Sequence, residues 1–227
     1  MVNGKEAKSR RERPAKAPLS REAIVDQALE ILTRYGLAGL SLRKIAAALD
    51  TGAASLYVYV ANLEELKSLI LDRAIGDVKI PPKIKGRWRV RLKAVAWSYM
   101  KVLIARPGLG QLAIQSIPVG PNTLRLMEAI AEMLLEGNLD QLAAAWALDA
   151  ILVHASAIAA EQDARRGQSR PLEWMKPALE DLNPKEHPNI AQLGDALLAG
   201  DGEARAQWGL EFMINGILST PIEATKL

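Results

Sequence analysis

The fold is decided by residues 41–66, SLRKIAAALDTGAASLYVYVANLEEL, which encode two short helices around a tight turn and the start of a third helix. Ser41 is a predicted N-cap, and apolar residues follow it at helical spacing in 42–49. The Asp-Thr-Gly segment at 50–52 predicts a turn, because Asp and Gly tolerate positive φ. Helix is expected to resume over 53–60, so the stretch predicts a helix-turn-helix.

One further helix on each side completes this unit. Ser20 is a predicted N-cap, and the apolar face of the helix that it opens ends near Tyr35. Gly36 supplies the left-handed residue that stops the helix. Asn62, with a glutamate three residues later, forms a capping box that opens a fourth helix. The sequence therefore predicts a DNA-binding unit of three to four helices over residues 19–76.

The second helix of the motif presents small or aromatic uncharged residues, so its backbone can approach DNA closely while hydroxyl groups reach phosphates or base edges. Arg43 and Lys44 lie on the outer side of the helix before it. The alternative is a small helical bundle with no role in DNA binding, but the succession of caps, turn and exposed groups favours the DNA-binding interpretation. The exposed positions are Ala53, Ala54, Ser55, Val58 and Tyr59.

Two segments and one single residue carry a family pattern: LSLRKIA at 40–46, SLYVYVANLEEL at 55–66, and Leu49 between them. In the second segment two aromatic residues precede Asn and a charged helix start. In these segments the chain resembles the TetR family of bacterial transcriptional regulators. The resemblance covers about the first third of the chain. It implies an N-terminal helix-turn-helix domain that binds double-stranded operator DNA, followed by a helical domain that binds a small-molecule effector and forms a homodimer.

The resemblance also implies which side chains meet DNA. Arg43 would contact a base or a phosphate, and Tyr57 would touch the DNA backbone. Ser55 and Tyr59 would lie against DNA, although the family usually has His in place of Tyr59. The family also has a phosphate-binding Lys at the start of the fourth helix, where this chain has Leu, and Lys67 one turn later is the expected partial substitute. The candidate DNA-binding residues are Ser41, Arg43, Lys44, Ala53, Ala54, Ser55, Tyr57, Val58, Tyr59 and Lys67.

Charge is distributed unevenly along the chain. Residues 78–127 carry ten basic and no acidic side chains, whereas residues 128–227 carry seven basic and sixteen acidic ones. A basic front attracted to phosphates and an acidic rear repelled by them would orient the molecule as it approaches DNA. The alternative, given equal weight, is that acidic residues of the distal half neutralise the basic run within the fold.

Residues 1–18 carry six basic and two acidic residues and hardly any large apolar side chain. They predict a flexible basic arm that tracks phosphates or enters the minor groove, with an inert solubilising tail as the alternative. No signal-peptide pattern follows the basic stretch, and no segment has the ~18 uninterrupted apolar residues that a membrane span needs. We therefore expect a cytoplasmic protein without a membrane partner.

Composition excludes several kinds of chemistry. The 227 residues include no cysteine, which excludes disulfides, thiolate metal sites and cysteine nucleophiles. The two histidines lack a partner at catalytic or metal-ligand spacing, and no phosphate-binding loop occurs, so no catalytic residue, metal or cofactor is expected. With 49% hydrophobic and 4% aromatic residues and no strand-like alternation, the chain is expected to be all-α.

The second half also consists of predicted helices. Residues 77–86, which contain two prolines, form a linker, and residues 87–220 form the effector-binding and dimerisation domain before a tail at 221–227. Gly137 is expected to end one helix and Asn138 to cap the next. The expected helices span 87–105, a short segment through 115, 121–136, 138–162, a short segment within 172–182, 190–199 and 203–218.

By the same likeness, the helices at 138–162 and 203–218 pair with those of a second copy in a four-helix bundle, and the central helices enclose a mostly apolar cavity. For each cavity residue, ordinary core packing is the alternative. These expectations describe a dimeric repressor released from its operator by an apolar effector through the fourth helix. A helical ligand-binding or partner-docking module without sequence-specific DNA binding is the alternative function. The expected cavity-lining residues are Trp97, Met100, Leu103, Met127, Ile130, Trp146 and His154.

Overall fold

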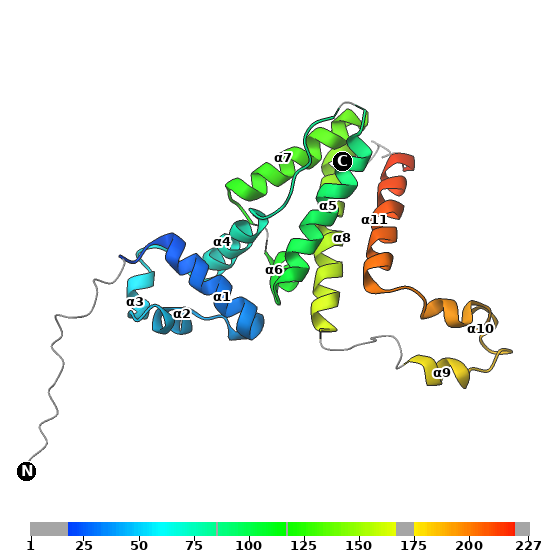
Figure 1. The fold of residues 1–227 in the computed structure, drawn as a ribbon, viewed down its shortest axis with the longest axis horizontal. Coiled ribbons are helices and arrows are strands. Elements are labelled where there is room, and N and C mark those ends of the chain that lie inside the picture. Colours follow the sequence, from blue (N-terminus) through cyan, green and yellow to red (C-terminus); the bar gives the residue numbers. More distant parts are fainter. Residues whose placement is uncertain (1–17, 85, 117, 167–174, 221–227) are drawn as a thin grey trace, which may run out of the picture.

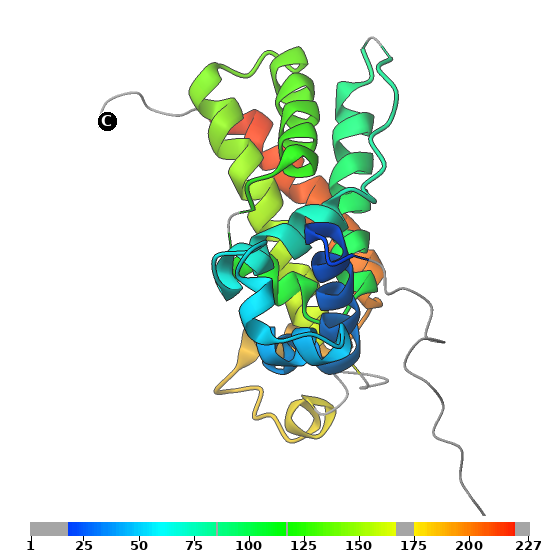
Figure 2. The ribbon, with the colours of Figure 1, turned by 90° about the vertical axis from the view of Figure 1, so that its left-hand side faces the viewer.

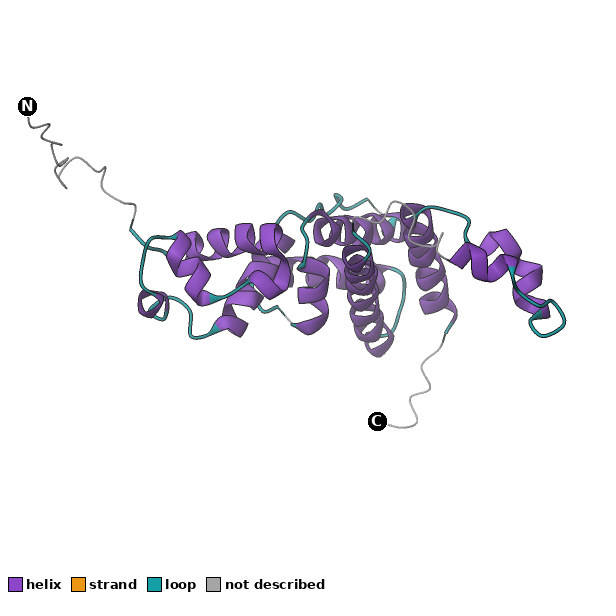
Figure 3. Cartoon of the chain, turned by 90° about the horizontal axis from the view of Figure 1, so that it is seen from below, coloured by secondary structure: helices purple, strands orange, loops and turns teal. Residues whose placement is uncertain are grey.

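A computed structural model describes residues 18–84, 86–116, 118–166 and 175–220. The described residues contain helices and no strand, which confirms the all-α prediction (Figure 3). The elements are α1 (Arg21–Gly39), α2 (Leu42–Ala48), α3 (Ala53–Leu56), α4 (Leu63–Ile75), α5 (Trp88–Ala105), α6 (Leu109–Gln115), α7 (Pro121–Glu136), α8 (Gln141–Ala164), α9 (Lys176–Glu180), α10 (Pro188–Leu193), the 3-10 helix η3 (Gly194–Leu197) and α11 (Gly202–Ser219).

Helices α1 to α4 form the head domain, here residues 18–76, and the predicted caps are present in it. The Ser20 hydroxyl accepts a hydrogen bond from the backbone N–H of Ala23 at 3.1 Å, and the Ser41 hydroxyl accepts one from Lys44 at 3.3 Å. Gly36 interrupts α1 with φ +67°, as expected for a left-handed stop. The side chains that fill the core of this domain are Ile24, Ala28, Leu32, Ile45, Leu56, Leu66, Ile70 and Leu71.

The second helix of the motif is shorter than predicted. Helix was expected over 53–60, but α3 ends at Leu56, and 57–59 form turns. The N–H groups of Tyr59 and Val60 both donate to the carbonyl of Leu56, so the segment stays compact without continuing as regular helix. Aromatic and β-branched residues at 57–60 lose rotamer freedom in a helix, which favours the early end.

Two predicted helix ends in the second half were wrong. Asp140, not Asn138, caps α8 by accepting from the N–H of Ala143 at 2.9 Å. Asn138 instead takes the left-handed conformation after α7, with φ +61°, which asparagine tolerates better than most residues. The helix expected over 190–199 breaks at Gly194, where φ is +47°, into α10 and η3.

Helices α5 to α8 and α11 form the body of the second domain, with the head domain to one side (Figures 1 and 2). Helices α6 and α8 pack so closely that a Cβ on Gly110 would lie 2.5 Å from the backbone nitrogen of Ala160. By length and composition alone, α8 also passes the test for a membrane span, a test that core helices of soluble proteins pass as well.

Helices α9, α10 and η3 extend from the body at the end opposite the head domain (Figures 1 and 3). None of these three elements contains a buried residue. The predicted short helix within 172–182 corresponds to α9, and its first part lies outside the described residues. Residues 1–17 of the basic arm predicted at 1–18, and the tail at 221–227, also lie outside them.

The close packing of α6 on α8 predicts opposite effects of two glycine substitutions. Gly110→Ala is expected to lower the free energy of unfolding by about 1–3 kcal/mol, because the methyl group overlaps the α8 backbone. Gly216→Ala in α11, where nothing lies within 4 Å of the new methyl group, is expected to raise it by roughly 0.5–1 kcal/mol through helix propensity. Urea unfolding at one protein concentration measures both, and equal effects would contradict the prediction.

Candidate nucleic-acid interface and effector domain

The turn between α2 and α3 orients the exposed face of the motif. Asp50 adopts φ +49°, and the N–H of Thr51 donates to the carbonyl of Ala46 at 2.9 Å, which folds the chain back on α2. Leu56 and Val60 anchor the far side of α3 in the core. Ala54, Ser55, Tyr57 and Val58 of the segment are exposed to solvent.

These exposed side chains are uncharged, as the sequence predicted. Tyr57 is 57% exposed and Val58 is 80% exposed. Ala54 and Ser55 are exposed beside them. Ala53 and Tyr59 are half-buried and pack partly on the core. The surface is small, apolar and edged with hydroxyl groups, a composition that lets a backbone approach a DNA groove.

The predicted cationic contacts differ in how available they are. Arg43 is exposed and has no ion pair with any described residue. The Lys44 ammonium lies 5.8 Å from the centroid of the Tyr35 ring, within cation–π range. Lys67 pairs with Glu64 at 2.8 Å and its side chain is largely buried, so a phosphate would have to replace that carboxylate. The Ser41 hydroxyl is engaged as the α2 cap.

The start of α4 is fixed by a modified capping box. The Asn62 side chain accepts from the N–H of Glu65 at 2.8 Å, as predicted. The Glu65 carboxylate accepts from the N–H of Ala61 at 2.6 Å, one residue before the cap, and also pairs with Arg21 of α1. This arrangement ties the ends of α1 and α4 together beside α3.

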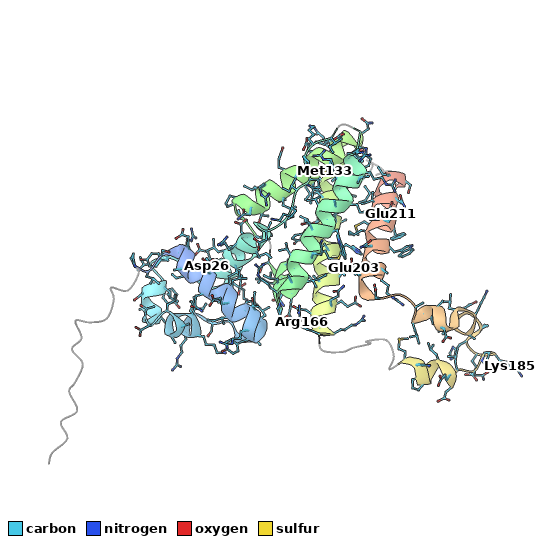
Figure 4. All side chains as sticks on the ribbon, in the orientation of Figure 1. Asp26, Met133, Arg166, Lys185, Glu203 and Glu211 are labelled. Atoms are coloured by element: carbon cyan, nitrogen blue, oxygen red, sulfur yellow. The ribbon has the colours of Figure 1, made fainter. Side chains whose placement is uncertain are left out.

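Part of the basic run at 78–127 pairs with acidic residues of the distal half, which favours the second interpretation of the charge pattern for those residues. Arg89 and Lys93 both pair with Glu211 on α11, at 2.7 and 2.8 Å, and these bonds lower the pKa of the Glu211 carboxyl (Figure 4). Arg91 is buried between Glu132 and Glu136 of α7, at 3.5 and 3.2 Å. These three basic residues therefore join α5 to α7 and α11.

The expected cavity residues divide into three groups by burial. Met100, Leu103 and Ile130 have no exposed surface and pack in the core. Trp97, Met127 and His154 are half-buried, whereas Trp146 is 52% exposed on the surface of the single chain.

A polar pair crosses the core of the effector domain. The hydroxyls of Tyr99 on α5 and Ser156 on α8 lie 3.2 Å apart, and burial raises the pKa of Tyr99. Neither residue was predicted from the sequence as a site residue. Both lie at inward positions of their helices, and a polar side chain at such a position was the available signal.

His154 lies between α8 and α11. Its buried Nε2 atom has no hydrogen-bond partner among the described residues, and a Cβ on Gly209 would lie 3.1 Å from it. Burial lowers the pKa of His154. A hollow of about 290 Å³ also lies between α8 and α11, but it is lined by other residues: Ile158, Glu161, Gln162, Arg165, Gly202, Arg205 and Ala206. The described residues contain no cluster of three side chains suited to holding a metal ion.

Residues 80–220 match the family model of the tetracyclin repressor-like C-terminal domain. An HTH-type transcriptional regulator of Saccharopolyspora erythraea is 30% identical over 208 residues, which cover 89% of this chain and 86% of that protein. The chain belongs to the TetR family of transcriptional regulators. The resemblance seen in the helix-turn-helix segment is thereby confirmed, and the protein is a DNA-binding regulator whose head domain carries the helix-turn-helix.

Solved TetR-family structures agree with this assignment over nearly the whole chain. Apo ActR from Streptomyces coelicolor is 35% identical with a TM-score of 0.83, covering 90% of this chain and 97% of ActR. ActR in complex with actinorhodin is 34% identical with a TM-score of 0.83, covering 89% of this chain and 98% of that ActR chain.

A second relative by sequence is the HTH-type transcriptional repressor DrrR1 of Streptomyces coeruleorubidus. It is 36% identical over 127 residues, which cover 54% of this chain and 47% of DrrR1.

The low pKa of His154 predicts how stability depends on pH. In the folded regulator burial makes the His154 imidazole take up its proton at a lower pH than in the unfolded chain, where its ordinary pKa is about 6.5. The unfolded state then binds more protons, so the free energy of unfolding should fall as pH drops below that value. His154→Gln is expected to reduce this fall, because it removes the buried imidazole. Urea unfolding between pH 5 and 8 measures the difference.

The exposed face of α2 and α3 predicts the effect of two substitutions on DNA affinity. Arg43→Ala and Tyr57→Ala are each expected to weaken operator binding by about 1–3 kcal/mol without changing the fold. Arg89→Ala, which removes a cation paired with Glu211 away from the motif, serves as the control and should leave affinity unchanged. Fluorescence anisotropy at fixed salt measures the affinities. Unchanged binding by both head-domain variants would contradict the assignment.

Proposed function

We propose that this TetR-family regulator is a cytoplasmic homodimeric repressor that binds a pseudo-palindromic operator and is released from it by a small, mostly apolar effector. The observation that carries the proposal is an apolar face left exposed on α8 and α11. A face of this kind calls for a second copy of the chain, and a second copy supplies the second head domain that site selection needs.

Aromatic side chains dominate this face. Trp208 is 70% exposed and Phe212 is 64% exposed on α11, with their rings stacked at a centroid separation of 5.6 Å. Trp146 and Val153 are more than half exposed on α8. Monomeric proteins rarely leave such neighbouring aromatic groups in water, and aromatic residues are enriched at interfaces. The exposed position of Trp146 also suits an interface better than the cavity wall first expected.

Dimer formation gives the protein its means of selecting a site. One short α3 touches too few bases to specify an operator, whereas two head domains related by a two-fold axis read two half-sites about 34–36 Å apart, or a nearby multiple. The uncharged face of α3 would lie in the major groove, with Arg43 and Lys44 on base edges or phosphates. Lys67 would bind a phosphate in place of the Glu64 carboxylate. The basic arm before α1 would add phosphate contacts.

The interior of the effector domain supports an apolar ligand. Met100, Leu103 and Ile130 meet there without exposed surface, so a ligand would have to move α5, α7 and α8 apart to enter. Methionine side chains adapt to such a change. The Tyr99 and Ser156 hydroxyls would supply a polar anchor in these surroundings. The structure of ActR in complex with actinorhodin supports a small-molecule effector for this chain.

The alternative, a ligand-binding or partner-docking module without sequence-specific DNA binding, has less support. The relatives are transcriptional regulators and repressors, and the head domain keeps an exposed α3 face and an available Arg43. Salt-dependent, sequence-selective binding to the DNA upstream of its own gene tests the proposal directly. Equal affinity for unrelated DNA would favour the module.

The exposed face predicts that charge on α11 prevents dimer formation. Phe212→Asp is expected to convert a micromolar dimer to a monomer, because two carboxylates would be buried near the two-fold axis. Leu124→Asp on α7, also an exposed apolar position, is the matched control and should remain dimeric. Light scattering with circular dichroism separates dissociation from unfolding. A dimeric Phe212→Asp variant would contradict this interface.

Effector and operator are expected to bind with negative coupling, and actinorhodin is the first probe because ActR binds it. If actinorhodin weakens operator binding by about 5–150-fold, saturating operator must weaken actinorhodin binding by the same factor. Calorimetry with and without operator DNA measures both affinities. Tight actinorhodin binding with unchanged operator affinity would contradict the coupling, and no binding would remove this compound as the effector.

A further inference from the structure

A buried carboxylate crosses the junction between the head domain and the effector domain. Asp72 of α4 is only 6% exposed. Its Oδ1 accepts hydrogen bonds from the backbone N–H and the hydroxyl of Thr123, both at 2.8 Å, and its Oδ2 accepts one from the Asn122 amide at 3.2 Å. Both partners lie in the first turn of α7. Asp72 therefore caps a helix of the other domain.

Helix α7 has no side-chain cap of its own. Gly120 occupies its N-cap position and has no side chain to offer. The first N–H groups of a helix lack partners within the helix, and the helix dipole favours negative charge at that end. The Asp72 carboxylate meets both requirements in a site shielded from water, where an unpaired polar group would be costly. A methyl group on Gly120 would overlap this carboxylate, so the glycine leaves the space that Asp72 occupies.

Further hydrogen bonds join α4 to the start of α7 on either side of Asp72. The Ser68 hydroxyl accepts from the N–H of Val119 at 3.2 Å. The Arg125 guanidinium donates to the carbonyls of Gly76 and Val78, at 3.4 and 3.3 Å. Helix α4 is thus held against α7 from its second turn to its C-terminal end. The head domain is joined to the effector domain by these contacts as well as by the linker after Gly76.

We propose that Asp72 is the positioning residue of the head domain: by capping α7 it fixes the direction of α4, and thereby sets the separation of the two α3 helices in the dimer. The inference rests on the proposed dimeric operator binding. Helix α7 packs on α5 and α8 in the effector domain. A displacement of α7 is carried to α4 through this carboxylate, and α4 packs on α1.

Amide hydrogen exchange on the DNA-free dimer tests the structural part. In Asp72→Ala, exchange in 70–76 and 122–125 is expected to be about tenfold faster or more, while exchange in α8 is unchanged. Asp72→Asn keeps an oxygen that accepts from Thr123, so its exchange rates should stay within about threefold of wild type. If Asp72→Ala does not fold, Thr123→Val, which removes one of the three donors, is expected to give an intermediate increase.

Spacing selectivity tests the positioning part. An operator selected from random DNA by the wild-type dimer is altered so that its half-sites lie one or two base pairs further apart. Wild-type affinity is expected to fall about tenfold or more, because its two α3 helices are held at one separation. The affinity of Asp72→Ala for the altered operator should fall by about threefold or less, since its head domains can change their separation. Gly120→Ala should behave in the same way, because Gly120 has φ −171°, which alanine accepts, and only the carboxylate is displaced.

A control separates positioning from a general loss of stability. Ile24→Ala removes a buried side chain from α1, away from the α4–α7 contact, and should lower stability while keeping the wild-type spacing selectivity. The proposal would be overturned if Asp72→Ala and Gly120→Ala both kept the exchange rates and the spacing selectivity of the wild type. If the wild-type dimer selects no operator, the proposed function fails, and the exchange rates still decide whether Asp72 holds α4 to α7.

Discussion

The rest of the molecule depends on how α4 is held, because α4 belongs to the head domain but one of its carboxylates caps a helix of the effector domain. Asp72 is nearly inaccessible to water and bonds to Asn122 and Thr123 at the start of α7. Ion pairs on the surface, such as Asp77 with Arg106, add little to such a junction because water and salt screen them. The buried carboxylate instead gives the two domains one preferred arrangement.

The two sides of helix α8 carry side chains of different size. Toward the interior, Ala159 and Ala160 let the backbone of α6 approach α8 closely at Gly110. On the other side, α8 and α11 leave Trp146 and Phe212 in solvent. In the proposed dimer a second copy covers this face, and each head domain stays joined to its own effector domain through α4.

The sequence predicts the local features well and the long-range ones poorly. Caps such as Ser20 and Asn62 act on neighbours three residues away, so their pattern is visible in the sequence. The partner of Asp72 lies 51 residues further along, and Arg89 pairs with Glu211 across 122 residues, so neither contact has a local signal. The exposure of Ala54, Ser55 and Val58 was predicted from helical spacing, whereas Ala53 and Tyr59 were expected to be exposed and are half-buried. The residues that line a ligand cavity were harder to predict, since only the packing of the folded chain decides whether an apolar side chain fills the core or lines a cavity.

The separation between the α3 helices in the DNA-free dimer tests the central claim most directly. The chain has no cysteine, so Ser55→Cys places one spin label on each α3 without competing sites. If the effector domains hold the head domains in place, double electron–electron resonance should show one narrow distribution of label-to-label distances. Its centre should lie near 34–36 Å or a nearby multiple, after allowance for roughly the length of the labels. A broad distribution, or no dipolar coupling between labels, would contradict the account.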